Sequence, residues 1–347
     1  MQYVILLRMR KKQAFCLTRK TFNFFSSSRK KYTRICRNTA AEKRKKMTKQ
    51  ERIAQLKEEK DAVIMAHYYV VPEIQEIADY TGDSFYLSKL AQGLKNKTIV
   101  YCGVDFMGES GKLLSPEKDI LMPAADADCP MAHMVTKEEI EKYRNEYQDL
   151  AVVCYINSTV EIKTWADVCV TSANAVKIVK NLPNKNILFI PDKNLGRYVA
   201  EQVPEKNVMV VKGYCPIHNS MKLEEITELK EAHPEAEILV HPECPEGICN
   251  MADYIGSTSG IIKYAGESQN KEFIIATEVG VLYELQKQNP DKTFYFTKTT
   301  PVCDDMKKLT LDKIIHVLET GENKAYVKPE MTSQSALTLE RMLELAK

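Results

Sequence analysis

The stretch AVIMAHYYVVPEI, residues 62–74, begins like a buried strand and ends in polar groups. Its first five residues are apolar, and a histidine and two tyrosines follow at positions 67–69 before Pro72 closes the segment. These three side chains need hydrogen-bond partners when they are buried, so a strand that serves only the core has no use for them. In open parallel sheets, ligands bind beyond the carboxyl ends of the strands. The stretch therefore predicts a strand whose end carries functional side chains.

Charge is distributed unevenly along the 347 residues of the chain. Residues 1–47 hold 15 lysines and arginines and a single acid, Glu42, whereas residues 48–347 hold 34 basic and 46 acidic side chains. The acidic body gives no sign of the basic face that nucleic-acid binding requires. No apolar run reaches the length of a membrane span. We expect a cytoplasmic protein without nucleic-acid or membrane partners.

Residues 1–46 form a basic, serine-rich leader that has three interpretations. Its composition fits an organelle transit peptide, but a secretory signal fits poorly because the apolar run at residues 4–7 is too short. In the third interpretation, residues 1–46 are not part of the mature protein and the real start is Met47. An amphipathic helical pattern begins just after this residue. We favour the third, with a basic disordered tail as the alternative, and exclude the leader from the fold.

Short apolar runs alternate with helical patterns through the rest of the chain, which is typical of parallel sheets with crossover helices. The predicted strands are residues 62–66, 98–102, 120–123, 150–155, 187–191, 208–212, 237–240, 273–276 and 293–297.

These elements repeat about every 87 residues, three times over. The first strand of each repeat ends in a pair of polar residues: His67 and Tyr69, Tyr155 and Asn157, and His241 and Glu243. The fourth strand of each repeat leads to a cysteine, and these cysteines, Cys129, Cys215 and Cys303, stand 86 and 88 residues apart. The repeat predicts three α/β/α modules at residues 47–132, 133–219 and 220–306, with a C-terminal helical segment at residues 307–347 that packs back on them.

A lone histidine at a strand end usually caps a core strand, and that interpretation would suffice for His67 alone. The same pattern in three repeats favours a shared site instead, because the carboxyl ends of the strands can face one common centre.

Three convergent cysteines predict a metal centre. Thiolates select zinc, copper(I) or iron–sulfur clusters. A [4Fe–4S] cluster with only three cysteine ligands keeps one iron open, so that iron can act as a Lewis acid in a dehydration. We expect one such cluster on Cys129, Cys215 and Cys303.

A structural zinc site is the rival interpretation. Cys215 with His218, and His241 with Cys244, have the spacing of paired zinc ligands. This set leaves Cys129 and Cys303 unexplained, so we rank it below the cluster. The remaining cysteines of the body have no regular disulfide spacing and are predicted to be reduced and buried; they are Cys102, Cys154, Cys169, Cys244 and Cys249.

Small polar residues stand where the second helix of each repeat is predicted to begin, at Ser84, Ser172, Ser257 and Thr258. Such residues are expected as helix N-caps. Helix amino ends that gather at one centre also bind anions, so they predict a small carboxylate or phosphate substrate.

From residue 47 to the C-terminus the chain resembles the quinolinate synthase family. The motifs that carry the resemblance are MAHYYVVPEIQEIAD, FMGESGKLLSPEK, PDKNLGRYVA, GYCPIH, LVHPEC, MADYIGSTSG and IATEVG. The resemblance implies three pseudo-symmetric α/β/α modules around a [4Fe–4S] cluster. It also implies a transferase of NAD biosynthesis that condenses iminosuccinate with dihydroxyacetone phosphate to quinolinate, phosphate and two waters. An L-aspartate oxidase or dehydrogenase would supply the iminosuccinate.

The resemblance also implies roles for individual residues. The cluster ligands would be Cys129, Cys215 and Cys303, and proton transfer would fall to Glu243, Tyr69 and His218. The residues that would hold the dicarboxylate are His67, Ser84, Tyr155, Asn157, Ser172, His241, Glu243 and Thr258. We expect His241, as a potential cation, and the iron to help Glu243 act as a base.

Two alternatives remain open. A non-catalytic iron–sulfur sensor or electron carrier would not need His67, Glu243 and the anion-binding helix starts around an open iron. Another [4Fe–4S] hydro-lyase acting on a small hydroxy acid would need them, and only the family resemblance separates it from quinolinate formation.

Overall fold

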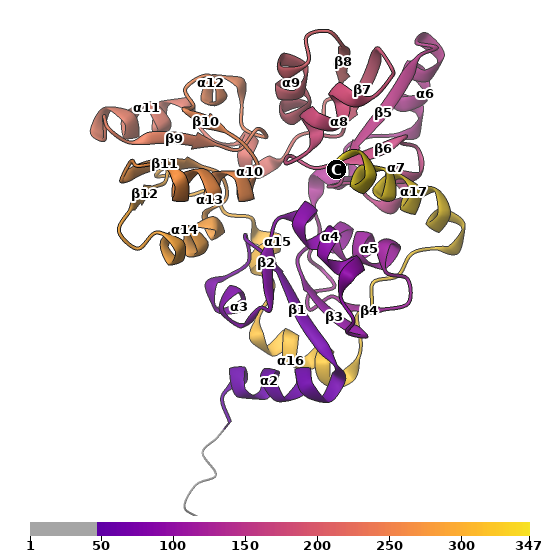
Figure 1. Ribbon diagram of the computed structural model, residues 1–347, viewed down its shortest axis with the longest axis vertical. Coiled ribbons are helices and arrows are strands. Elements are labelled where there is room, and N and C mark those ends of the chain that lie inside the picture. Colours follow the sequence, from indigo (N-terminus) through magenta and orange to yellow (C-terminus); the bar gives the residue numbers. More distant parts are fainter. Residues whose placement is uncertain (1–46) are drawn as a thin grey trace, which may run out of the picture. The chain divides into compact units, whose positions relative to one another are not determined.

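The chain folds into three parallel four-stranded sheets that have the same strand order (Figure 1). The first sheet has the order β2-β1-β3-β4 and consists of β1 (Ala62–His67), β2 (Tyr80–Gly82), β3 (Thr98–Cys102) and β4 (Asp119–Leu121). The second has the order β6-β5-β7-β8 and consists of β5 (Leu150–Tyr155), β6 (Val168–Val170), β7 (Asn186–Ile190) and β8 (Asn207–Val210). The third has the order β10-β9-β11-β12 and consists of β9 (Glu237–Val240), β10 (Tyr254–Ile255), β11 (Glu272–Ala276) and β12 (Thr293–Tyr295).

This structure is a computed structural model that describes residues 47–347, so the predicted leader at residues 1–46 lies outside the described residues. The predicted α/β class with three pseudo-symmetric modules is confirmed by the three sheets and their flanking helices. Residues Lys49–Lys347 form a single compact unit. The bounds of the individual modules therefore stay a prediction.

Helices connect the strands in the same sequence in each sheet. Around the first sheet they are α2 (Lys49–Lys60), α3 (Pro72–Ile77), α4 (Ser84–Gly93), α5 (Asp105–Leu114) and η1 (Pro130–His133). Around the second they are α6 (Lys137–Glu146), α7 (Val160–Thr164), α8 (Ala175–Asn181), α9 (Lys193–Gln202) and α10 (Pro216–Asn219). Around the third they are α11 (Leu223–Ala232), α12 (Glu246–Cys249), α13 (Thr258–Glu267), η2 (Val279–Val281), α14 (Leu282–Gln288) and α15 (Asp304–Lys307). The chain ends in α16 (Leu311–Thr320) and α17 (Pro329–Leu345).

All nine predicted strands are present, with ends that differ from the prediction by two residues at most. The prediction missed β2, β6 and β10, which have three, three and two residues. These strands lie at the sheet edges and pair only with β1, β5 and β9. A segment this short has no periodicity to detect, because its extended form comes from pairing with the longer neighbour.

An aspartate contact repeats in all three sheets. The aspartate before each short edge strand accepts a hydrogen bond from a backbone amide in the neighbouring central strand, and the pairs are Asp79 with Ile64 at 2.8 Å, Asp167 with Val152 at 2.7 Å and Asp253 with Ile238 at 2.8 Å. A buried backbone amide that has no strand partner at this position needs such an acceptor. The recurrence shows the threefold repeat at the level of single hydrogen bonds.

A lysine contact also repeats. The ammonium group before each fourth strand donates to carbonyl oxygens at or just beyond the end of a helix, from Lys118 to Ala91 at 3.2 Å, from Lys206 to Asn184 at 2.8 Å and from Lys292 to Ser268 at 2.7 Å. Cations are stabilised there because the last carbonyls of a helix lack intrahelical partners.

The hydrophobic core is continuous through the first and second sheets but not through the third. Helix α17 packs on α5, α7 and β6, and so contacts both of the first two units, while α16 packs on α2. The third sheet has one hydrophobic cluster on each face, around Ile238 and Val240 on one side and around Leu239 and Phe273 on the other. None of the buried hydrophobic residues of β9–β12 belongs to the core cluster that the first two sheets share.

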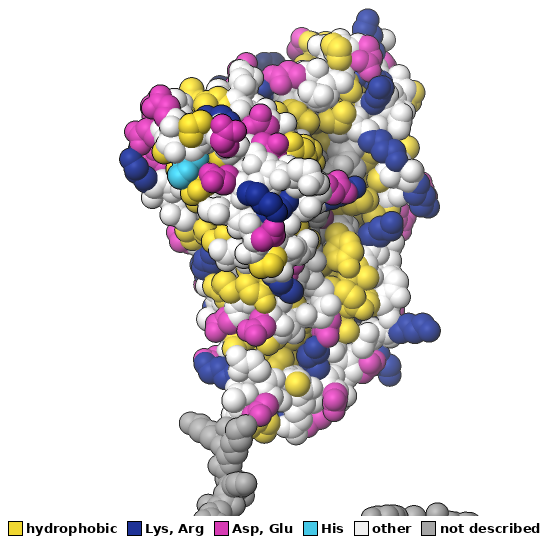
Figure 2. All heavy atoms as spheres, turned by 60° about the vertical axis from the view of Figure 1, so that its left-hand side comes forward, with side chains coloured by type: hydrophobic (Ala, Val, Ile, Leu, Met, Phe, Trp, Pro, Cys, Tyr) yellow, Lys and Arg dark blue, Asp and Glu magenta, His cyan; other side chains and the backbone are white. Residues whose placement is uncertain are grey.

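The face in Figure 2 shows acidic and basic side chains interspersed over the described residues. No helix in this part of the chain has the length and the apolar character needed to cross a membrane.

Gly280 marks a close approach between the third and first units. A Cβ atom on this residue would lie 2.7 Å from the Cα of Tyr69 and 2.8 Å from the carbonyl oxygen of Tyr68. The side-chain amide of Gln75 joins the same two segments, because it donates to the carbonyls of Tyr68 at 2.8 Å and of Gly280 at 3.0 Å.

We expect Gly280→Ala to separate these backbones and to displace Tyr69. The free energy of unfolding should fall by about 1–3 kcal/mol, the usual cost of overpacking, and turnover should fall with it. The control is Gly266→Ala in α13, where the nearest atom to the added Cβ is 3.8 Å away; it should raise stability by up to about 1 kcal/mol. Urea unfolding of both variants checks this, and equal stability of the two would contradict it.

Candidate functional site

One cavity of about 250 Å³ collects side chains from all three units. Every residue with a predicted ligand, substrate or catalytic role lies in its lining: His67, Tyr69, Ser84, Cys129, Tyr155, Asn157, Ser172, Cys215, His218, His241, Glu243, Thr258 and Cys303. Their chemical roles stay predictions, but their convergence on one space is a feature of the fold.

The central strand of each sheet delivers polar side chains to this cavity. His67 and Tyr155 are the last residues of β1 and β5, and His241 directly follows β9. The second polar residue of each pair stands two positions further on, and it lines the cavity as well. The carboxyl end of the strand that carries His67 and Tyr69 thus forms part of a wall shared by the three units.

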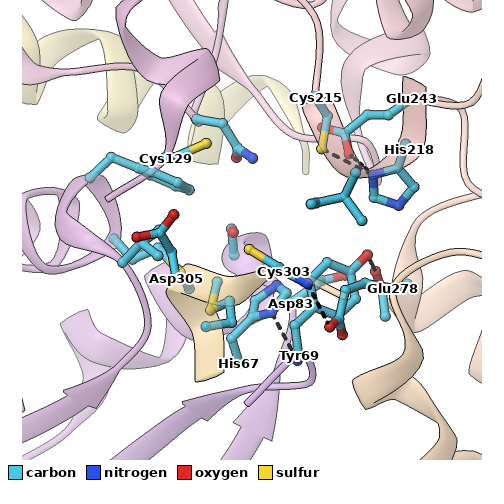
Figure 3. A pocket seen from close by; sticks show the side chains of 18 of the residues that line it. His67, Tyr69, Asp83, Cys129, Cys215, His218, Glu243, Glu278, Cys303 and Asp305 are labelled. Atoms are coloured by element: carbon cyan, nitrogen blue, oxygen red, sulfur yellow. Dashed lines mark hydrogen bonds and ion pairs between the residues drawn. The ribbon is translucent and has the colours of Figure 1, made fainter. Parts of the chain in front are cut away.

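The three cysteines occupy equivalent places in the three units. Cys129, Cys215 and Cys303 are the N-cap residues of the one-turn helices η1, α10 and α15, each with an extended backbone. In Figure 3 their sulfurs point into the same open space. None of the three sulfurs accepts a capping hydrogen bond within the described chain. The Cys215 sulfur does lie 3.2 Å from Nδ1 of His218 in the same one-turn helix.

Acidic side chains fix the backbone of these cysteines. The Cys215 amide donates to Asp192 at 2.9 Å, and the Cys303 amide donates to Glu278 at 3.1 Å. Asp192 and Glu278 also cap the helices that follow β7 and β11. Val104 holds the corresponding N-cap in the first unit, and there the Cys129 amide donates at 2.7 Å to its own neighbour, Asp128. The contacts of Asp192 and Glu278 tie the loops of Cys215 and Cys303 to their sheets, which is how outer residues orient metal ligands.

The electrostatics of the thiols fit a group that brings positive charge. Burial raises the pKa of Cys129, Cys215 and Cys303, and Glu243 raises it further for the first two. Backbone amides of the following one-turn helices oppose this effect in all three cases. All eight cysteines of the described chain are free thiols. Three free thiols in one cavity, each at a helix start and next to no disulfide partner, are a suitable donor set for an iron–sulfur cluster.

The rival zinc set of Cys215, His218, His241 and Cys244 is wrong in its last member. Cys244 is fully buried in the core on one face of the third sheet, and its sulfur lies 3.5 Å from the sulfur of Met221. Glu243 joins the first two members instead: ligand atoms of Cys215, His218 and Glu243 lie within 4.8 Å of one another, in a group that contains neither His241 nor Cys244. These three residues form a possible metal-binding group. Cys102, Cys154, Cys169 and Cys249 are buried as predicted.

Glu243 is a buried, ionised carboxylate with one free oxygen. Its Oε2 lies 2.8 Å from Nδ1 of His218 and 3.4 Å from Nδ1 of His241. Burial raises the pKa of Glu243, but the two histidines and a hydrogen bond from Tyr155 outweigh burial and lower it to about 2. Oε1 is buried without a hydrogen-bond partner in the described chain. This oxygen is ready to accept a proton or a hydrogen bond from a ligand.

The histidines at the strand ends are neutral. Burial lowers the pKa of His241 to about 3, and burial together with the nearby Lys307 lowers that of His67 to about 3. Burial lowers the pKa of His241 more than the adjacent Glu243 raises it, and the expected help of His241 to Glu243 stays a prediction. Both rings can still donate and accept hydrogen bonds.

Tyr69 and Tyr155 are neutral hydroxyl groups. Burial raises the pKa of both well above the usual tyrosine range, and Glu243 raises it further. The Tyr69 hydroxyl lies 2.8 Å from the hydroxyl oxygens of both Thr258 and Thr277. Tyr69 is thus linked to the third unit by side chains as well as by Gly280.

The predicted helix caps need correction. Of Ser84, Ser172, Ser257 and Thr258, only Ser257 caps a helix, where it accepts from the Gly260 amide at 3.1 Å. Asp83 caps α4 in place of Ser84, and α8 begins three residues after Ser172. Ser84 and Thr258 are instead the first residues of α4 and α13. The Ser172 hydroxyl lies 3.2 Å from Nε2 of His241.

Sequence reasoning missed several residues around the cavity. Asp83 accepts from Ser259 at 2.5 Å and so joins the first and third units, and Lys307 forms an ion pair with buried Glu278 at 2.8 Å. The acids of PDK and ATE, two residues after the third strand of their repeats, were visible signals for Asp192 and Glu278. The missed apolar lining consists of Phe85, Val104, Phe106, Met107, Pro130, Pro216, Ile217 and Met306.

Comparison with known proteins identifies relatives of this chain. The family model described as "NadA: Quinolinate synthetase A protein" matches residues 51–344. A protein of Clostridioides difficile (strain 630) named quinolinate synthase is 52% identical over 294 residues, which cover 85% of this chain and 97% of that protein. One of Fusobacterium nucleatum subsp. nucleatum with the same name is 54% identical over 296 residues, covering 85% of this chain and 99% of its own length. A third, from Caldicellulosiruptor saccharolyticus, is 48% identical over 294 residues, with coverage of 85% and 97%.

Proposed function

The chain belongs to the quinolinate synthetase A family, and we propose that it condenses iminosuccinate with dihydroxyacetone phosphate to quinolinate, phosphate and two waters in NAD biosynthesis. One observation carries this proposal: three free cysteines, one from each unit, line the same cavity as a buried carboxylate and neutral strand-end histidines. The enzyme class is then a transferase.

Cys129, Cys215 and Cys303 are the residues that would hold a [4Fe–4S] cluster. With three protein ligands the cluster supplies Lewis-acid polarisation of a leaving group. The hydrogen bonds from the Cys215 and Cys303 amides to Asp192 and Glu278 support a preformed ligand set.

The dicarboxylate is held by neutral hydrogen-bonding groups and helix starts. His67, His241 and Tyr155 would donate to carboxylate oxygens from strand ends. The amino ends of α4 and α13, at Ser84 and Thr258, would add backbone amides, which favour anions. The side-chain oxygen of Asn157 is buried without a partner in the described chain, so it can accept from the imine nitrogen. Ser172 would complete the set.

Glu243 and Tyr69 would move the protons. The methylene carbon of iminosuccinate must lose a proton before it bonds to the triose, and Oε1 of Glu243 is the free oxygen that can take it. A carboxylate with a pKa near 2 is a weak base. A bound dicarboxylate raises that pKa, because like charges disfavour the ionised form. Each departing water needs a proton on a hydroxyl, and we assign its delivery to the Tyr69 hydroxyl, with His218 beside Glu243.

The apolar side of the cavity would exclude bulk water. Val104, Phe106, Met107 and Met306 are all buried lining residues. A dry wall opposite the polar groups strengthens their electrostatic interactions and protects a hydrolysable imine. Because iminosuccinate is such an imine, we also propose that an L-aspartate oxidase or dehydrogenase supplies it.

The proposal is tested with anaerobically prepared protein that contains its full iron and sulfide. Iminosuccinate and dihydroxyacetone phosphate together should give quinolinate, and omission of either should give none. The alternative, an iron–sulfur hydro-lyase, predicts that malate or citrate alone is dehydrated to an unsaturated acid, which ultraviolet absorbance detects. Dehydration of a single hydroxy acid without quinolinate formation would replace the proposal by the alternative.

A further inference from the structure

In each of the three units, one side chain reaches back to the loop that follows the central strand. This side chain is the fourth residue of the next helix, which is α3, α7 or α12. It donates to the backbone carbonyl one residue past the second polar residue of the strand end. The three pairs are Gln75 with Val70 at 3.0 Å, Lys163 with Ser158, and Cys249 with Cys244 at 3.5 Å.

The contact has the same place in all three units but a different donor in each. A thiol is a weak donor, so the contact of Cys249 adds little. The backbone of Glu243 has another support there, because Asn194 donates to its carbonyl at 2.9 Å. Gln75 shows that a neutral amide at this position can reach the loop carbonyl. The second unit uses an ammonium group for the same contact.

Lys163 is a fully buried lysine. Its Nζ donates to the Ser158 carbonyl and lies 5.6 Å from the centre of the Phe106 ring, which lines the cavity. Among residues 47–347, no carboxylate forms an ion pair with this ammonium group. A buried charge without such a partner is costly, and an apolar side chain of the same length would fill the space at less cost. The hydrogen bond, rather than the packing, therefore accounts for a lysine here.

The loop that Lys163 contacts carries Asn157. Asn157 lines the cavity, and its Oδ1 is buried without a partner in the described chain. The next residue, Ser158, donates from its amide to the Ile156 carbonyl at 2.8 Å and from its hydroxyl to the Tyr155 carbonyl at 2.9 Å. These two bonds tie the loop only to itself. The bond from Lys163 to the Ser158 carbonyl ties it to α7.

We propose that Lys163 is a positioning residue, which holds the loop after β5 so that the side-chain oxygen of Asn157 faces the substrate. This inference rests on the proposed function, which assigns that oxygen to the imine nitrogen of iminosuccinate. The contact with the imine exists before and during the reaction. Its loss should therefore weaken the binding of iminosuccinate more than it slows turnover.

Two variants separate the donor from the packing. Lys163→Met keeps the length of the side chain and removes the donor, while Lys163→Gln supplies the donor that the first unit uses at this position. We expect the Met variant to raise the KM for iminosuccinate about tenfold, as the loss of one hydrogen bond does. Turnover and the KM for dihydroxyacetone phosphate should stay within a few-fold of the wild type. The Gln variant should restore the KM for iminosuccinate.

The matched control is Lys180→Met, which replaces an exposed lysine of α8 in the same unit. It should change neither KM. Thermal melting of all variants shows whether they fold, and we expect melting temperatures close to that of the wild type.

A second readout does not depend on turnover. Hydrogen exchange reports the local opening of a segment. The amides of Ser158 and Thr159 donate to the carbonyls of Ile156 and Ala132, at 2.8 and 3.3 Å. We expect both amides to exchange faster in the Met variant than in the wild type, and the Gln variant to restore their protection.

Each outcome decides the proposal. A Met variant with a wild-type KM for iminosuccinate overturns it, as does a Gln variant that is as impaired as the Met variant. A Met variant that does not fold, or that loses turnover and both KM values alike, also overturns it, because the role of Lys163 is then structural. If the wild-type protein forms no quinolinate, the proposed function fails. Hydrogen exchange then still decides whether Lys163 holds the loop, and unchanged protection in the Met variant overturns the inference.

Discussion

Replacing any one of Cys129, Cys215 and Cys303 with serine should abolish the visible absorbance of the cluster in anaerobically prepared protein. A serine hydroxyl ionises far less readily than a thiol and is a hard donor, so it does not replace thiolate on iron. With only two thiolates left in a cavity that already disfavours charge, we expect iron and sulfide content to fall close to zero. Quinolinate formation should fall with them.

The matched controls are Cys244→Ser and Cys249→Ser. Cys244 faces the core near Met221, and Cys249 lies in α12, so both should leave the cluster largely intact. Thermal melting of every variant separates cluster loss from unfolding. Equal loss of iron in Cys244→Ser, or stoichiometric zinc without iron in the wild type, would contradict the assignment of the three ligands.

Glu243→Gln should lower turnover by a factor on the order of 10²–10⁴, the typical contribution of a general base. The glutamine keeps the shape of the side chain and one acceptor oxygen for His218, but it cannot take up a proton. Substrate affinity should fall less than turnover, because the dicarboxylate is held mainly by neutral donors and helix starts. The measurement is quinolinate formation under saturating substrates, with iron and sulfide determined on the same sample.

Glu284→Gln is the control for this variant. Glu284 is a buried carboxylate in α14 outside the cavity, paired with Lys287 at 3.0 Å. Its replacement should leave turnover near the wild-type value. A Glu243→Gln variant with a full cluster and near-normal turnover would show that Glu243 only completes the end of β9 and that the base lies elsewhere.

Much of the fold was predictable because the repeat consists of apolar runs of strand length that recur in the same order. Strands β3, β5 and β9 have the predicted bounds, since each is a largely buried run with a clear end: β5 and β9 end at polar residues, and β3 ends before Gly103. Strands of two or three residues, such as β10, depend on a neighbour in space and leave no pattern. The aspartates that hold these edge strands, Asp79 among them, look in the sequence like ordinary loop residues.

The convergence of the polar strand ends was predictable from topology, since parallel strands present their carboxyl ends on one side of the sheet. The protonation state of His241 was not predictable from the sequence, because it depends on the burial of the ring and on the adjacent Glu243 together. Thr277 left no signal either, since its partners lie 59 and 208 residues away in the chain. The N-cap prediction for Ser84 was wrong because Asp83, one residue earlier, accepts the hydrogen bond from the Tyr86 amide.

The most direct test of the proposed reaction is the stoichiometry of a single anaerobic incubation. Wild-type protein with a full cluster, given iminosuccinate and dihydroxyacetone phosphate, should release one phosphate for each quinolinate formed, and Glu243→Gln at equal iron content should form far less of both. Phosphate release without quinolinate, or a loaded wild-type protein that forms neither product, would contradict the account.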